Sequence, residues 1–181
     1  MKNMFPAGIL GSLLTSSRHQ ERAILAFAWL GSFLGILCIA ALERFVINDA
    51  EYPFLIGSFG ASCVLVFGAP ASPLAQPRNL IGGHLVSALV GVACQQMLPE
   101  AGWLAAALAV STAILLMSLT KTLHPPGGAT ALIAVAGGEG IHGLGWLYPL
   151  FPCLAGALIL LAVGLVSNNI VRRGRYPLQW F

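Results

Sequence analysis

The charged residues of this chain fall in short clusters, and the stretches between the clusters are apolar and long enough to form membrane-spanning helices. Only 8% of the 181 residues are charged and 57% are apolar, whereas about a quarter of the residues in an average soluble domain are charged. A water-soluble surface cannot be built from so few charges. We therefore predict an all-α integral membrane protein. Its net charge of +3 is expected to interact with lipid head groups and not with nucleic acid.

Six apolar stretches can be marked along the chain, and two of them depart from a regular span. The second is interrupted by glycines, and the fifth has roughly half of the ~20 residues that a span needs. If both cross the membrane the chain makes six passes, and if both fold back it makes four. Six passes leave eight basic residues with the cytoplasmic termini and one outside, which the positive-inside rule favours over four passes. The stretches are 23–42, 52–69, 80–98, 102–119, 127–136 and 145–167.

The two halves of the chain carry a short internal repeat. Residues 60–66 align with residues 128–134, so that two small residues, a hydroxyl and an apolar run recur. Three segments in each half would place the halves in opposite orientations, and transporters built this way bind substrate where two broken helices meet. Chance similarity between common membrane residues is the alternative. The expected regions are a cytoplasmic lead-in at 1–22, a transmembrane region at 23–170 with repeats at 23–98 and 102–167, and a basic cytoplasmic tail at 171–181.

The second break in the apolar pattern joins a histidine to two prolines and two glycines. A helix interior excludes proline but its first turn accepts it, so we expect a short helix that begins at about Pro126, deep in the membrane. Its unpaired amides and positive dipole end would attract an anion, and a protonated histidine would add a charge. The alternative is a tight surface turn whose histidine only caps the backbone. The binding residues predicted here are His124, Gly127, Gly128, Ala129 and Thr130.

The matching first break is predicted to complete this site, because exposed backbone at such depth needs a ligand, water or a polar neighbour. His84 lies inside the third segment, where an ionisable side chain indicates function or, near the interface, simple snorkelling. Arg78 either attracts an anion at the cytoplasmic mouth or only fixes orientation. The first-break residues of the predicted site are Ser58, Gly60, Ala61 and Ser62.

Signatures of enzymes are missing from the sequence. It contains no Gly-x-Ser-x-Gly elbow, His-Glu-x-x-His pair or phosphate loop, and no paired carboxylates inside a span. The four cysteines lie far apart in apolar runs, as expected of small core residues and not of a metal or redox site. We expect no enzymatic activity, cofactor or metal.

Three stretches, at 58–62, 68–79 and 123–132, resemble the HPP family of integral membrane proteins, named for the His-Pro-Pro signature that this chain carries at 124–126. The resemblance covers about residues 22–170. It implies four membrane helices, fewer than the six segments marked above. Because plant chloroplast and cyanobacterial relatives are implicated in nitrite transport, it also implies a permease for nitrite or a similar small anion.

Our leading hypothesis is therefore a transporter or channel for a small monovalent anion, nitrite first, held between opposed half-helix ends in a bacterial inner membrane. Two alternatives stay open, namely a channel for a neutral solute such as water or urea, and a scaffold subunit that transports nothing. The glycine-rich helix faces would suit a homodimer as well as internal packing.

Overall fold

The computed structural model describes residues 7–47, 56–172 and 176–180, and every regular element in these ranges is helical. The α-helices are α1 (Ala7–Leu42), α2 (Ser58–Cys63), α3 (Pro77–Met97), α4 (Gly102–Leu119), α5 (Pro125–Ala136), α6 (Glu139–Leu144) and α7 (Ala155–Arg172). Short π-helical turns are η1 (Glu43–Ile47), η2 (Val64–Gly68) and η5 (Pro149–Leu154), and 3-10 turns are η3 (Pro73–Ala75) and η4 (Gly145–Leu147).

Four helical stretches are long and apolar enough to cross a membrane, namely Gln20–Phe45, Pro77–Met97, Gly102–Leu119 and Pro149–Ile170. Two shorter apolar helices, Ser58–Gly68 and Pro125–Ala136, fall at the second and fifth predicted segments. At 1.5 Å per residue the 12 residues of α5 rise only about 18 Å, against hydrocarbon of about 30 Å. These two elements are therefore half-helices, as their interrupted sequences indicate.

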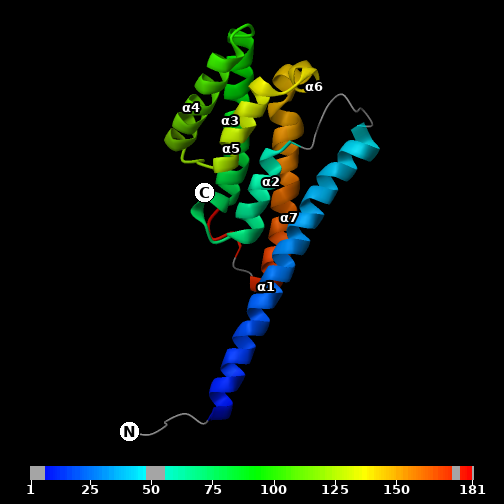
Figure 1. The fold of residues 1–181 in the computed structure, drawn as a ribbon, viewed down its shortest axis with the longest axis vertical. Coiled ribbons are helices and arrows are strands. Elements are labelled where there is room, and N and C mark those ends of the chain that lie inside the picture. The colour runs from blue at the N-terminus through cyan, green and yellow to red at the C-terminus, as the bar shows by residue number, and fades with distance from the viewer. Residues whose placement is uncertain (1–6, 48–55, 173–175, 181) are drawn as a thin grey trace.

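The helices form two groups that meet at α2 and α5. In Figure 1 the long α1 lies along α7, while α3, α4 and α5 pack together on the other side of α2. The chain runs downward through α2 and upward through α5 in this view, so the two half-helices point in opposite directions. Their beginnings consequently lie inside the bundle, where the side chains described below meet.

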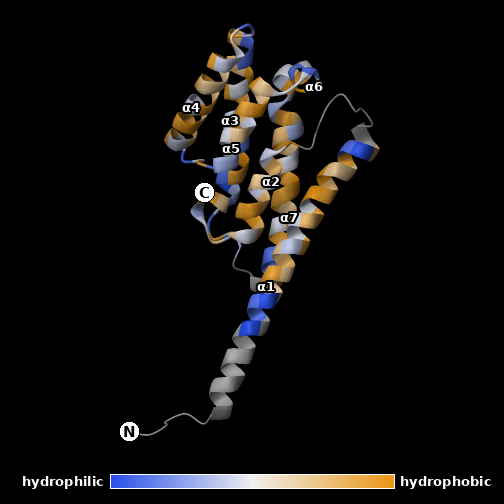
Figure 2. Cartoon of the chain, in the orientation of Figure 1, coloured by the Kyte–Doolittle hydropathy of each residue, from blue (hydrophilic) through white to orange (hydrophobic). Residues whose placement is uncertain are grey.

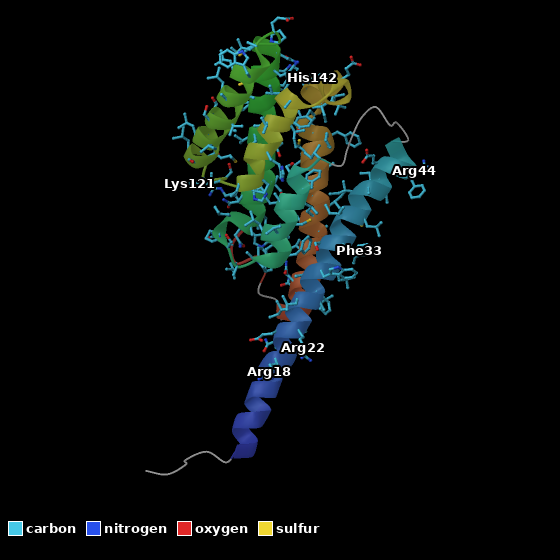
Figure 3. The ribbon with its side chains drawn as sticks, in the orientation of Figure 1. Arg18, Arg22, Phe33, Arg44, Lys121 and His142 are labelled. Atoms are coloured by element: carbon cyan, nitrogen blue, oxygen red, sulfur yellow. The ribbon has the colours of Figure 1, made fainter. Side chains whose placement is uncertain are left out.

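Large apolar side chains point outward along the long helices. Trp29 on α1 is 67% exposed and Trp103 at the start of α4 is 80% exposed. Figure 2 shows apolar residues along the length of α1, with polar residues gathered toward both ends of its coloured part. In Figure 3, Arg18 and Arg22 lie toward the lower end of α1, and Arg44 lies in η1, beyond its upper end. A helix with this distribution is stable with lipid around its middle and water at its ends.

Prolines mark where the inner helices begin. Gln76 precedes Pro77 at the start of α3, and His124 precedes Pro125 at the start of α5. A proline at the first helical position loses nothing, because that position has no partner for an N–H group. The third segment was predicted to begin at residue 80, which is wrong by one turn, so Arg78 belongs to the first turn of α3 and not to a loop.

The sixth predicted segment, 145–167, is not one continuous helix. Phe151 has a non-helical backbone (φ −144°, ψ 96°) between Pro149 and Pro152, and regular α-helix resumes only at α7. Pro152 has no N–H group to donate and cannot continue an ordinary helix across this point. The two prolines were visible in the sequence, but the run was apolar enough to be marked as unbroken.

Small residues let the helices approach closely at Gly31, Gly35 and Gly156. A methyl group at Gly31 would lie 2.6 Å from Phe67 Cδ1, and one at Gly35 would lie 2.8 Å from Leu160 Cδ2. A methyl group at Gly156 would overlap the Phe59 ring. The glycines therefore hold α1 and α7 against the α2–η2 half-helix, the kind of contact that packs helices in lipid.

The two terminal regions are more structured than the sequence indicates. Helix α1 begins at Ala7, inside the predicted lead-in 1–22. In the predicted tail, Gln76 Oε1 accepts a hydrogen bond from the Leu178 amide at 2.8 Å, and the Tyr176 hydroxyl donates to the Ala75 carbonyl at 2.9 Å. Residues 176–180 thus pack against the connection between η3 and α3.

Candidate functional site

A cluster of buried polar side chains lies where the two half-helices begin. Its members come from α2, α3 and α5 and from the residue that precedes α5, and each is completely buried. We call it the central cluster, and its residues are Ser58, Ser62, His84, His124 and Thr130. Because burying unpaired polar groups costs several kcal/mol in hydrocarbon, the partners of these side chains decide what the cluster can do.

Ser62 joins the two imidazoles. Its Oγ lies 2.8 Å from His84 Nε2 and 2.9 Å from His124 Nε2, and the two ring centroids are 5.1 Å apart. His124 Nδ1 lies 2.9 Å from the Leu74 carbonyl oxygen, so this nitrogen must carry a hydrogen and donate. A hydroxyl of the first break thus bridges the signature histidine of the second break to a histidine of α3.

Thr130 closes the other side of the cluster. Its Oγ1 lies 2.8 Å from His84 Nδ1 and 3.0 Å from Ser58 Oγ. The first and second breaks therefore touch twice, through Ser62 with His124 and through Ser58 with Thr130. His84, for which snorkelling toward the interface was an alternative, is instead held at the middle of the cluster.

Tyr148 is a member of this region that sequence reasoning missed. It is completely buried, and its hydroxyl donates to the Thr130 carbonyl at 3.0 Å. The sequence did contain a signal for it, because Tyr148 directly precedes Pro149, where the helix of the sixth predicted segment is interrupted. A buried tyrosine hydroxyl needs a partner, and a backbone carbonyl of the half-helix provides it.

The backbone at the start of α5 is less open than predicted. Pro125 and Pro126 have no N–H groups, and the Gly127 amide donates to the His124 carbonyl at 2.8 Å. The expectation of an unpaired amide at Gly127 is therefore wrong for this arrangement of the chain. The next two residues, Gly128 and Ala129, are half-buried. In the first break, Gly60 and Ala61 are exposed and lie outside the central cluster.

Glycines bring α3 and α5 together so that the histidines can meet. A methyl group at Gly83 would overlap the His124 Cβ atom and would lie 3.0 Å from the Thr122 carbonyl oxygen. A methyl group at Gly127 would lie 2.9 Å from the Gly83 carbonyl oxygen. These two positions therefore set the distance between His84 and His124.

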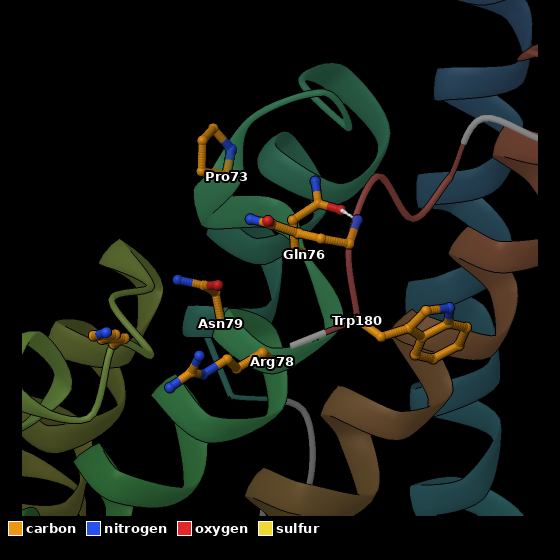
Figure 4. A pocket seen from close by; sticks show the side chains of 7 residues that line it. Pro73, Gln76, Arg78, Asn79 and Trp180 are labelled. Atoms are coloured by element: carbon orange, nitrogen blue, oxygen red, sulfur yellow. Dashed lines mark hydrogen bonds between the residues drawn. The ribbon is translucent and has the colours of Figure 1, made fainter.

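A pocket of about 260 Å³, lined by none of the central-cluster residues, carries basic side chains. Arg78 donates to the Thr120 carbonyl at 2.7 Å, and Asn79 donates to the Leu123 carbonyl at 2.8 Å, which ties α3 to the loop before α5. Figure 4 shows Gln76, Asn79 and Arg78 around this space, with Trp180 of the tail nearby. The pocket is lined by Pro73, Gln76, Arg78, Asn79, Lys121, Gln179 and Trp180.

The pocket and the cluster are neighbours along the chain. Pro73 lines the pocket, and the next residue, Leu74, accepts the hydrogen bond of His124. The predicted pathway residues are thus separated, with Arg78 at the pocket and His84 in the cluster. Among the residues that the structure describes, no three His, Cys, Asp or Glu side chains gather as a metal site would require.

Sequence comparison agrees with this architecture. The model of a protein family described as "HPP, transmembrane region" matches residues 17–177, which is most of the chain. The chain belongs to the HPP transmembrane family. Two transmembrane proteins of Dictyostelium discoideum are 50% and 48% identical to this HPP protein over 160 residues, or 87% of its length. The matches cover 56% and 51% of those relatives, so the HPP protein spans about half their length. No solved structure matches the chain.

Proposed function

We propose that this HPP protein is a membrane transporter or channel for a small monovalent anion, with nitrite as the first candidate, and that the anion binds at the central cluster. The observation that carries the proposal is the pair His84 and His124, bridged by Ser62 between the beginnings of two half-helices. A protonated imidazole supplies positive charge in a region where an unpaired anion would be expelled.

Two further features support an anion over a cation. The central cluster is built from hydroxyl and imidazole groups and contains no carboxylate. The neighbouring pocket carries Arg78 and Lys121, and a basic pocket raises the local concentration of anions at its mouth. An anion entering from this pocket would meet His124 after passing Leu74.

The opposite directions of α2 and α5 support the finer architecture that the sequence suggests. In it, the half-helices lie at the centres of two inverted three-segment repeats, so that the chain makes six passes. Arg18, Arg22, Arg78 and Lys121 would then lie on the cytoplasmic side together with both termini. A bacterial inner membrane and a homodimer complete this proposal.

Transport by the purified protein in liposomes tests the function. Nitrite uptake by the wild type is expected to fall to the background of empty vesicles in His124→Ala. His124→Gln keeps hydrogen-bonding capacity without the charge, and we expect it to fold and to lose uptake as well. His142→Ala is the matched control, because His142 is an exposed histidine on α6 whose Nε2 bonds only with the Val135 carbonyl, at 3.0 Å.

Two results would overturn the proposal. The first is a wild type that moves no nitrite, nitrate or formate, and the second is full uptake by His124→Gln. Urea or water flux that nitrite does not inhibit would favour the neutral-solute channel instead, since the central cluster satisfies its own hydrogen bonds without any charge.

A further inference from the structure

The hydrogens of the central cluster can be ordered from its geometry when both histidines are neutral. His124 Nδ1 donates to the Leu74 carbonyl, so His124 Nε2 has no hydrogen and must accept from the Ser62 hydroxyl. Ser62 has one hydrogen and has now used it. The contact between Ser62 and His84 Nε2 therefore requires that His84 Nε2 donate, which leaves His84 Nδ1 as an acceptor.

The same reasoning continues beyond His84. Thr130 must donate to His84 Nδ1, and its single hydrogen is then used. The 3.0 Å hydrogen bond that Thr130 donates to Ser58 is therefore not made in this arrangement, because the Thr130 hydrogen is already used. The bonds that join Thr130 to His84, Ser62, His124 and the Leu74 carbonyl all point the same way, toward the side of the basic pocket.

We propose that Thr130, His84, Ser62 and His124 form one proton relay, which delivers a proton from the Ser58 side of Thr130 to His124. A proton that reaches Thr130 Oγ1 from water on the Ser58 side displaces the Thr130 proton to His84 Nδ1, the His84 Nε2 proton to Ser62, and the Ser62 proton to His124 Nε2. One proton enters and one is gained at His124, which becomes an imidazolium while His84 stays neutral and changes tautomer.

Once the proton is on His124, the relay satisfies every contact. Thr130 then donates to Ser58, His84 Nδ1 donates to Thr130, and Ser62 donates to His84 Nε2. His124 donates from both nitrogens, to Ser62 and to the Leu74 carbonyl. The inference rests on the proposed function, because the imidazolium formed in this way is the positive charge that would hold the anion.

Surrounding groups leave the two imidazoles as the proton-bearing pair. The other titratable side chains include Cys63 on α2, next to Ser62, Cys94 on α3, Cys153 in η5, and Tyr148, which directly precedes η5. The charged Arg78 and Lys121 lie at the pocket, beyond the Leu74 contact. Thr130 at the donor end contacts Ser58, which is buried and follows the exposed Gly57, whereas His124 at the acceptor end contacts Leu74, whose neighbour Pro73 lines the pocket.

Nitrogen NMR of histidine-labelled protein in bilayers tests the relay without transport. At neutral pH we expect His84 in the Nε2–H form and His124 in the Nδ1–H form. On acidification, His124 should gain a second proton while His84 changes to the Nδ1–H form at the same pH. Variants His19→Gln and His142→Gln assign the signals. If His84 keeps its tautomer while His124 becomes charged, Ser62 has turned to the Ser58 carbonyl, 3.1 Å away, and the relay is wrong.

Matched variants locate the path. Ser62→Ala should abolish the coupled change at His84, while Ser111→Ala, which removes an exposed hydroxyl bonded to its own helix, should leave it intact. In liposomes containing a trapped pH dye, nitrite uptake should carry protons, and Thr130→Val should slow the proton movement about a hundredfold. Thr130→Ser keeps the hydroxyl and should restore it.

The outcomes separate the relay from the transport proposal. Nitrite uptake without proton movement in the wild type would refute the relay and leave anion transport standing. Coupled titration of His84 and His124 in a protein that moves no anion would support the relay and refute the transport function.

Discussion

The two adjacent glycines of the signature should respond in opposite ways to the same substitution. Gly127 faces α3, and a methyl group there would lie 2.7 Å from Ser87 Oγ, 2.8 Å from Met117 Sδ and 2.9 Å from the Gly83 carbonyl oxygen. At Gly128 a methyl group would meet nothing within 4 Å. Gly127→Ala must therefore push α5 away from α3, whereas Gly128→Ala changes no contact.

The magnitude follows from comparing the two variants. Both replace glycine by alanine in the first turns of one helix, so the gain from helix propensity, at most about 1 kcal/mol, is shared. Overpacking of a close contact costs about 1–3 kcal/mol, and a backbone carbonyl cannot rotate away as a side chain can. At roughly 2–4 °C per kcal/mol for a chain of this length, Gly127→Ala should unfold about 2–12 °C below Gly128→Ala.

Thermal unfolding of the two detergent-solubilised variants, followed by helical circular dichroism, measures this difference. Because Gly127 sets the spacing of His84 and His124, Gly127→Ala should also reduce nitrite uptake, while Gly128→Ala should keep it near the wild-type rate. Equal melting temperatures, or a less stable Gly128→Ala, would refute the close packing of α3 against α5.

Three further changes test contacts around the site. Tyr148→Phe removes the bond to the Thr130 carbonyl and should lower the free energy of unfolding by about 0.5–1.5 kcal/mol, measured by denaturant titration. Asn168→Leu leaves the Val66 carbonyl, which Asn168 Nδ2 contacts at 2.9 Å, without this donor, and should cost about 1–3 kcal/mol in the same assay. Burial raises the pKa of Tyr176 to about 12. The stabilisation that its protonated hydroxyl gives to the packing of residues 176–180 should therefore be complete below pH 10 and disappear as the pH rises through 12. Tyrosinate absorbance of wild type and Tyr176→Phe checks this.

Much of the framework could be predicted from sequence because it depends on local rules. Apolar length identified the four long spans, and Pro125 with Pro126 identified the start of α5 to within one residue. The contact between the two breaks was also expected, because breaks inside a membrane need polar partners.

The remainder depends on contacts between residues far apart in the chain. No local rule indicates that His84 stands between Ser62 and Thr130, since a histidine near a segment end can equally snorkel. Tyr148 and Gln76 were missed for the same reason, because each is defined by a backbone partner in another element. Asn168, which directly follows the sixth apolar stretch, is buried against η2, where it donates a hydrogen bond to the Val66 carbonyl.

The depth of the half-helix beginnings tests the central claim most directly. A Cβ atom at Gly128 or at Gly102 would meet nothing within 4 Å, so a spin-labelled cysteine is introduced at each position in a background without the four native cysteines. Relaxation by lipid-soluble oxygen and by a water-soluble nickel complex then reports the depth of each label. We predict that Gly128 lies well inside the hydrocarbon and Gly102 at the head groups. A Gly128 label as open to nickel as the Gly102 label would place the signature at the membrane surface and contradict an anion site between the half-helices.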